Sequence, residues 1–303
     1  MGGLGLLMRR RAIQAHPTTG SDYIKFADDE VLNVLMSKGV SSDGVGITKD
    51  DAARVTNIAS WFTGNAIISS FKEFVEFKGV TFLTGRYPST AAFINCKGLE
   101  EIDLPDSITS FDGDGHETSN GGTGIFWGCT NLKRCRMSSG LKILPGAMFY
   151  NAPLEELSNL DWSKITRIGR RCINKGTLSY DILNLASLVT YEIGALAGVT
   201  ARKVIMPKVT SLPKCNYEYD LPKGMQILDL GESIAELPYH AIYGKTNLTL
   251  IVRAITPPTL NANAITQKPT AIYVPNEAID AYKAAANWST YANIIMPLSE
   301  YQG

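Results

Sequence analysis

The chain has 303 residues, 45% of them apolar and 19% charged, so it can bury a large core and is not disordered by composition. Lysine plus arginine equals aspartate plus glutamate at 29 each, and this balance excludes nucleic acid as an expected partner because no global field attracts it. The five cysteines are an odd number without C-x-x-C spacing, which excludes a disulfide framework and a zinc site.

Residues 1–20 are expected to form a flexible or anchoring peptide. Residues 1–8 are apolar and three arginines follow them, which is the reverse of the order in a secretory signal. Two interpretations stay open: a frayed terminus, or an attachment peptide that contacts a partner through residues 1–16. The attachment residues would be Leu6, Leu7, Arg9, Arg10 and Arg11. No stretch reaches the eighteen apolar residues of a transmembrane helix, so no membrane span is expected.

Residues 21–78 have a helical period and are expected to form an N-terminal cap. Asp28 or Asp29 can start a helix that carries Val31 and Leu35, and residues 48–51 approximate a capping box for a second helix. Ser69 or Ser70 can cap a third, short helix. Its aromatic side chains, Phe71, Phe74 and Phe77, are expected to cover the open end of the following repeats instead of lining a binding groove.

Between residues 79 and 275 the chain returns seven times to one pattern, an apolar pair spaced two apart that proline or glycine often follows. The pairs are Ile102/Leu104, Cys135/Met137, Leu183/Leu185, Val204/Met206, Leu228/Leu230, Leu250/Val252 and Ile272/Val274, with a weaker copy near Leu157 and Leu160. The second members are 33, 48, 21, 24, 22 and 22 residues apart; the step of 48 spans the weaker copy and that of 33 contains a polar insertion. The underlying period of about 22 to 24 indicates stacked coils that are unstable individually.

Each coil is expected to contribute one short strand to a ladder. A proline directly after the strand cannot extend the ladder and fixes its end, as at Pro105, Pro207 and Pro275. Segments such as 106–111 and 232–237 then form a polar turn and an apolar return. In residues 276–303, Asn276 is expected to cap a helix that carries Ile279 and Tyr282 and covers the last coil.

Candidate binding residues lie in two places, and each has a second interpretation. Asp112, Asp114 and His116 belong to the polar insertion, which is either a weak cation site or, more often for such Asp-Gly repeats, a solvated recognition loop. A group of tyrosines over two neighbouring repeats suits recognition of a protein or glycan if exposed, whereas alternation along the strands favours half of them or more pointing inward. These tyrosines are Tyr217, Tyr219, Tyr239 and Tyr243.

No catalytic pattern stands out. The three histidines lack nucleophile or carboxylate partners at a recognisable spacing, and no phosphate-binding glycine loop follows a strand. We therefore expect no enzyme activity, no cofactor and no metal site. Five arginines either form a basic stripe along one edge or are simply solvated: Arg134, Arg136, Arg167, Arg170 and Arg171.

The repeat unit, with its spacing Phe93-x-x-Cys96-x-x-Leu99-x-x-Ile102-x-Leu104-Pro105, and the C-terminal order of residues 255–259, 272–275, 281–285 and 288–289 resemble BspA-type leucine-rich-repeat proteins. The resemblance covers residues 79 to 298. It implies a leucine-rich-repeat solenoid, a right-handed superhelix with one short β-strand per coil and small helical caps at both ends. It also implies non-enzymatic binding or adhesion to a protein or cell-surface polysaccharide, with no catalytic residues.

Two locations and two roles follow from this resemblance. The family suggests the cell surface or the extracellular space, but no secretion signal precedes the repeats, so release in a particle or by lysis is the alternative. The chain also resembles proteins of phages or prophages of gut bacteria. The alternative function is therefore a structural or host-attachment accessory of a phage particle, anchored through residues 1–16.

Overall fold

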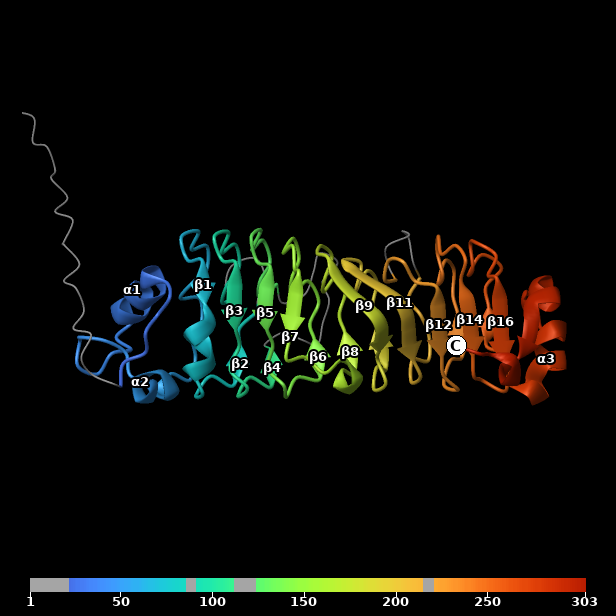
Figure 1. The fold of residues 1–303 in the computed structure, drawn as a ribbon, viewed down its shortest axis with the longest axis horizontal. Coiled ribbons are helices and arrows are strands. Elements are labelled where there is room, and N and C mark those ends of the chain that lie inside the picture. Colours follow the sequence, from blue (N-terminus) through green and yellow to red (C-terminus); the bar gives the residue numbers. More distant parts are fainter. Residues whose placement is uncertain (1–21, 86–90, 112–123, 215–220) are drawn as a thin grey trace, which may run out of the picture.

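The architecture is a row of parallel strands with helices at both ends (Figure 1). A computed structural model describes residues 22–85, 91–111, 124–214 and 221–303. Helices α1 (Asp29–Ser37) and α2 (Lys49–Arg54) lie at one end of the row, and α3 (Ile279–Ala284) lies at the other. Consecutive windings of the chain are therefore neighbours in space, and the two ends of the row are far apart.

Both N-terminal helices begin where the sequence predicts. Asp28 is the N-cap of α1 and accepts a hydrogen bond from the Glu30 amide at 2.9 Å. The capping box of α2 is confirmed, because Thr48 accepts from the Asp51 amide while the Asp51 carboxylate accepts from the Thr48 amide. The second oxygen of Asp28 accepts from the Ser69 amide at 2.6 Å and so ties α1 to the first strand of the ladder.

The main ladder consists of two parallel sheets whose strand order follows the chain. The first contains β1 (Ser70–Phe71), β3 (Glu101–Asp103), β5 (Arg134–Arg136) and β7 (Glu156–Ser158). The second contains β9 (Leu178–Asn184), β11 (Val199–Met206), β12 (Ile227–Leu230), β14 (Thr249–Val252), β16 (Ala271–Val274) and β17 (Ile295–Pro297). Every predicted apolar pair falls on or directly beside one of these strands, so the repeat register is confirmed.

A second series of strands corrects the expectation of one strand per coil. Two-residue strands pair in parallel within the segments that the sequence identifies as apolar returns. They are β2 (Phe82–Leu83), β4 (Ser110–Phe111), β6 (Ile143–Leu144), β8 (Arg167–Ile168), β10 (Thr190–Tyr191), β13 (Glu236–Leu237) and β15 (Thr259–Leu260). The return segments pair because stacking at the period of the main strands brings their backbone groups opposite one another as well.

The core runs through the interior of the coils as rows of equivalent side chains. Leu104, Met137, Leu185, Met206 and Leu230, the predicted interior row, are all fully buried. Phe62, Phe93, Phe126 and Phe149 form a second row with ring centroids 5.2 to 5.4 Å apart. The predicted register of Cys96 and Cys129 is confirmed, since each is buried and its Sγ donates to the carbonyl of the phenylalanine one coil earlier.

The predicted third helix of the N-terminal segment is wrong in its start. Ser70 and Phe71 form β1, which pairs with β3, and the following helix is a short 3₁₀ helix (Lys72–Glu76) without a side-chain cap. The two candidate capping side chains are used elsewhere, because the Ser69 hydroxyl donates to Asp28 at 2.8 Å and the Ser70 hydroxyl donates to Glu101 at 2.9 Å. The prediction that the aromatics are core is confirmed, since Phe71, Phe74 and Phe77 are fully buried.

The C-terminal segment also departs from its prediction. Asn276 lies inside a 3₁₀ helix (Asn276–Ala278) that leads into α3, and its side chain exchanges hydrogen bonds with Ser299 at 2.9 and 3.2 Å instead of capping a helix. A 3₁₀ helix (Trp288–Ile294) follows, and Ile295 then begins β17 and extends the ladder beyond Val274. Two further 3₁₀ helices are Trp162–Lys164 and Leu298–Glu300.

The last residues return across the outer face of the second sheet. Tyr301 packs on Tyr273 of β16 with ring centroids 5.1 Å apart. The Lys203 ammonium of β11 donates to the Tyr301 hydroxyl at 3.3 Å and to the Gly303 carbonyl at 3.4 Å. The terminal segment therefore crosses β14 and β12. In this region Ile251 is fully buried, and its register neighbours Asp229 and Tyr273 are buried and half-buried.

Candidate functional site

Charged side chains on the outer face of the ladder pair between neighbouring coils. Glu101 lies between the Lys72 ammonium at 2.9 Å and the Arg134 guanidinium at 3.1 Å. Arg136 binds Asp106 at 2.8 Å, and Arg167 binds Glu192. Three of the predicted arginines are thus neutralised by carboxylates of the adjacent coil, so they form neither a free basic stripe nor a merely solvated set.

These pairs shift the pKa of the carboxyl groups. Burial alone would raise the pKa of Glu101, but hydrogen bonds from Lys72, Ser70 and Arg134 outweigh burial and lower it. Asp103, on the same strand, has a raised pKa because burial is the largest influence on it and the Arg136 charge compensates only in part. Such shifts are typical of structural ion-pair networks as well as of reactive sites.

An aromatic group projects from the turn between β13 and β14. The Tyr239 and His240 rings stack with centroids 3.7 Å apart, and the Tyr243 ring lies 4.8 Å from His240. Tyr239 is 43% exposed, and the other two side chains are half-buried. His240 has a φ of 57°, a left-handed conformation that few non-glycine residues adopt. Of the four predicted tyrosines, the two that the structure describes are therefore not in the core.

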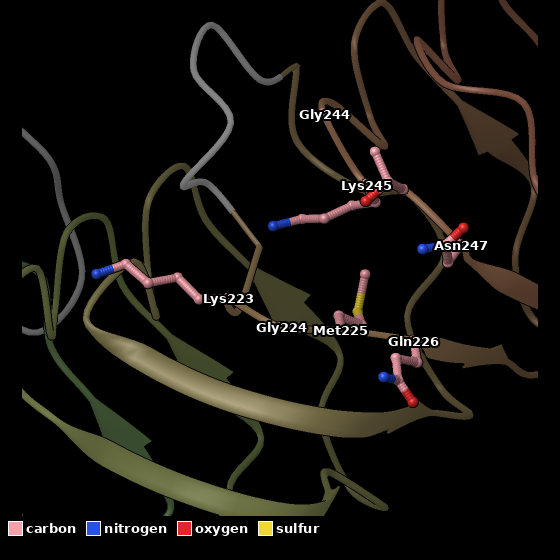
Figure 2. A pocket seen from close by; sticks show the side chains of 8 residues that line it. Lys223, Gly224, Met225, Gln226, Gly244, Lys245 and Asn247 are labelled. Atoms are coloured by element: carbon pink, nitrogen blue, oxygen red, sulfur yellow. The ribbon is translucent and has the colours of Figure 1, made fainter.

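A polar cavity of about 350 Å³ begins at the residue after Tyr243 (Figure 2). Lys245 is buried, and its ammonium donates to the main-chain carbonyls of Leu221 and Pro222 at 3.1 and 3.0 Å. Figure 2 shows Lys223 and Lys245 extending in the same direction from two neighbouring coils. Gln226, Thr246 and Asn247 supply amide and hydroxyl groups, so the lining offers several hydrogen-bonding groups within one hollow.

A second aromatic pair lies in equivalent turns of earlier coils. Trp127 and Tyr150 stack with ring centroids 4.2 Å apart, and both are half-buried. Trp127 lies between β4 and β5, and Tyr150 between β6 and β7, in the same type of connection as Tyr239. Sequence reasoning missed this pair. The signal for it is an aromatic residue directly after a row phenylalanine, at Phe126-Trp127 and again at Phe149-Tyr150.

Most of the other predicted site residues lie outside the described residues. These are Tyr217 and Tyr219, Asp112, Asp114 and His116, and the attachment residues Leu6, Leu7, Arg9, Arg10 and Arg11. In the chain, residues 112–116 come after β4 and before β5, and residues 217–219 come between Ser211, which pairs with β13, and β12.

The buried thiols have no features of reactive groups. Burial raises the pKa of Cys129, Cys135 and Cys172 well above the ordinary thiol range, and a reactive cysteine requires the opposite shift. Across the described ranges, no three histidine, cysteine, aspartate or glutamate side chains gather in a metal-binding arrangement. The helices in these ranges are too short and too polar to cross a bilayer.

Comparison with known proteins links the repeats to one family. The family model described as the BspA type leucine rich repeat region matches residues 68–179 in six copies. The match begins two residues before β1, inside the segment that the sequence analysis assigned to the cap, and ends within β9. No curated protein shows significant similarity to the chain.

Proposed function

We propose that this chain, whose repeats at residues 68–179 belong to the BspA-type leucine-rich-repeat family, is a non-enzymatic binding or adhesion protein. Its coils would form a right-handed solenoid, with the N-terminal and C-terminal helices as caps that shield the last coils from water. Repeats of this family commonly serve as binding scaffolds. The proposed ligand is a surface polysaccharide, bound at the edge that contains the connections between the short strands and the main strands.

The observation that carries this proposal is the aromatic group next to the polar cavity. The stacked rings of Tyr239 and His240, with the tilted ring of Tyr243 beside them, offer apolar area with little side-chain entropy to lose. The cavity beside them is lined by Gln226, Thr246 and Asn247, whose amides and hydroxyl can both donate and accept hydrogen bonds. A sugar ring needs this combination, because it has apolar C–H faces and a rim of hydroxyl groups.

The rigidity of the site supports the same conclusion. His240 and Ile242 donate backbone hydrogen bonds to the next coil at 3.0 and 2.8 Å, and the Gly244 amide donates to the Thr266 hydroxyl at 2.8 Å. Lys245 fixes the preceding coil through two carbonyls. A site fixed on both sides loses little entropy on binding, and so uses its contacts for affinity.

The test compares binding of the full chain to immobilised polysaccharides and to intact bacterial and epithelial surfaces. Replacing both Tyr239→Ala and Tyr243→Ala is expected to weaken binding at least tenfold, because the stacking surface disappears while the backbone bonds remain. Tyr23→Ala is the matched control, since Tyr23 is an exposed tyrosine in the N-terminal segment. Equal binding by the parent chain and the double variant would contradict the proposal that the ligand binds at this site. Binding lost after protease treatment of the target, but kept after periodate treatment, would assign a protein ligand instead.

A further inference from the structure

Two adjoining cavities lie where β12, β14 and β16 end, near the C-terminal end of the row. One has a volume of about 560 Å³ and is lined by residues that follow β12 and β14, and the other has about 470 Å³ and reaches past β16 to Ser299. Both are lined by Glu232 and Ile255, so they adjoin at these two residues, and together they are here called the terminal groove.

The centre of the terminal groove is apolar and exposed. Ile255 is 62% exposed, and the half-buried Pro257 continues the apolar surface beside it, whereas Pro258 is buried. The groove is also preformed, because Trp288 Nε1 donates to the Pro258 carbonyl at 2.8 Å and the Tyr282 hydroxyl donates to the Ala254 carbonyl at 2.7 Å. A large aliphatic side chain exposed on a rigid base is a suitable anchor point for an extended peptide.

The rim of the terminal groove has an excess of negative charge. Arg253 is its one basic residue, and two hydrogen bonds of 2.7 and 2.9 Å already commit its guanidinium to Asp229. Glu232 lies close enough to contribute to the raised pKa of Arg253, for which Asp229 is the largest cause. Neither Glu232 nor Glu277 forms an ion pair with another side chain in the described ranges, so two exposed carboxylates border an apolar surface.

We propose that the terminal groove binds residues 4–11 of a second copy of this chain. That segment contains Leu4, Leu6, Leu7 and Met8 followed by Arg9, Arg10 and Arg11, the one run of three consecutive basic residues in the sequence. The leucines would pack on Ile255 and Pro257, while the arginines face Glu232 and Glu277. The complementarity therefore combines an apolar anchor with opposite charges next to it.

The distances favour a second copy over the same chain. Seven strand-to-strand steps separate β1 from β14, which is about 34 Å at a strand spacing of about 4.8 Å. Residues 12–21 span at most about 36 Å when fully extended, and α1 and α2 lie at the end of the row beyond β1 (Figure 1). Contacts between the N-terminal segment of one copy and the C-terminal end of the next would give a head-to-tail row of copies.

The binding test uses a labelled synthetic peptide of residues 1–13 and fluorescence anisotropy. The partner is the full chain with Arg9→Glu, Arg10→Glu and Arg11→Glu, so that its own segment does not compete. We expect saturable binding that weakens at least tenfold when Glu232→Lys and Glu277→Lys are added. The matched control adds Glu100→Lys and Glu156→Lys, two exposed glutamates before β3 and in β7, and is expected to change affinity less than twofold.

Sedimentation of the unmodified chain tests the contact between copies. The apparent mass of the unmodified chain is expected to rise with concentration, whereas the groove variant is expected to stay a monomer. A chain that combines the groove and arginine substitutions is expected to associate again, because the opposite charges are restored in reverse. Thermal unfolding checks that each variant is folded. Absence of peptide binding, or binding equal in the groove variant and the control, overturns the proposal. A monomer at every concentration overturns the contact between copies even if the peptide binds.

Discussion

Asp106 shows how one exposed residue can connect three coils. Its Oδ1 accepts from the Ser139 amide at 2.9 Å and from Asn159 Nδ2 at 3.0 Å, while its Oδ2 accepts from Arg136 at 2.8 Å. The Ser139 amide and the Arg136 guanidinium lower the pKa of Asp106 to about 2. Because half of the side chain is exposed, solvent screens much of this stabilisation.

Replacing Asp106→Asn is expected to lower the free energy of unfolding at pH 7 by about 1 kcal/mol. The folded-state pKa lies below the unfolded value of about 3.9, so the contribution of the carboxylate is complete above pH 4 and disappears as the pH falls to about 2. Urea unfolding of both proteins between pH 7 and 2.5 should show this difference closing below pH 4. Glu100→Gln, at an exposed position, is the control. A difference that does not vary with pH contradicts this account.

The phenylalanine row shows how equivalent positions of successive coils stabilise one another at the scale of elements. Phe126 is fully buried between Phe93 and Phe149, with interplanar angles of 15° and 7°. Each ring fills the open face of one coil and covers the next. The row ends at Phe149. Its amide donates to the carbonyl of Cys172 in the next coil, and the thiol side chain of Cys172 cannot continue a stack of rings.

Replacing Phe126→Ala should lower the free energy of unfolding by about 3–5 kcal/mol, because the cavity opens to two coils at once. Phe126→Leu keeps most of the volume and should cost about half as much or less. Chemical denaturation of the two variants measures both losses. Equal losses would mean that the ring geometry, and not the filled volume, accounts for the stability.

The C-terminal segment that returns across the second sheet is a second element, and its role in covering the outer face of that sheet can be tested. Tyr301 contacts Tyr273 through its ring and Lys203 through its hydroxyl. Tyr301→Ala is therefore expected to lower stability by about 1–2 kcal/mol and to increase the fluorescence of an apolar dye, because the outer face around Ile251 becomes accessible. Tyr301→Phe keeps the ring and should lose less than half as much. A dye signal that does not change in the alanine variant would contradict the claim that Tyr301 covers the outer face around Ile251.

Over the whole molecule, a destabilising substitution should lower the stability of the nearby coils and not that of all coils equally. Each coil contacts mainly its neighbours in the ladder, so a substitution at one end should destabilise only the coils near that end. Trp288 is fully buried at the C-terminal end, where it packs edge-on against Tyr282 at 5.1 Å and binds the Pro258 carbonyl.

Trp288→Ala is expected to accelerate amide hydrogen exchange in β14, β16 and β17 at least tenfold, while β3 and β5 keep their protection. Hydrogen–deuterium exchange read by mass spectrometry resolves these strands separately. The reciprocal control is Phe74→Ala at the other end of the row, which should expose β1 and β3 first. Equal acceleration along the chain would show one cooperative unit and contradict nearest-neighbour stability.

The sequence by itself determined the repeat, its register and the buried rows. Leu104, Met137 and Leu230 could be placed because a short strand alternates in and out, and stacking repeats this alternation at a constant spacing. The start of α1 at Asp28 and the capping box at Thr48 were equally accessible, since capping depends on residues two or three positions apart.

Only the tertiary structure decided the features that depend on partners distant in the chain. Ser70 joins a strand and not a helix because Asp28 and β3 take its backbone groups, and Asn276 binds Ser299 instead of capping a helix. The terminal groove arises in the same way, from side chains of neighbouring coils. Local propensity cannot rank such contacts, because their energy exists only after the coils have stacked.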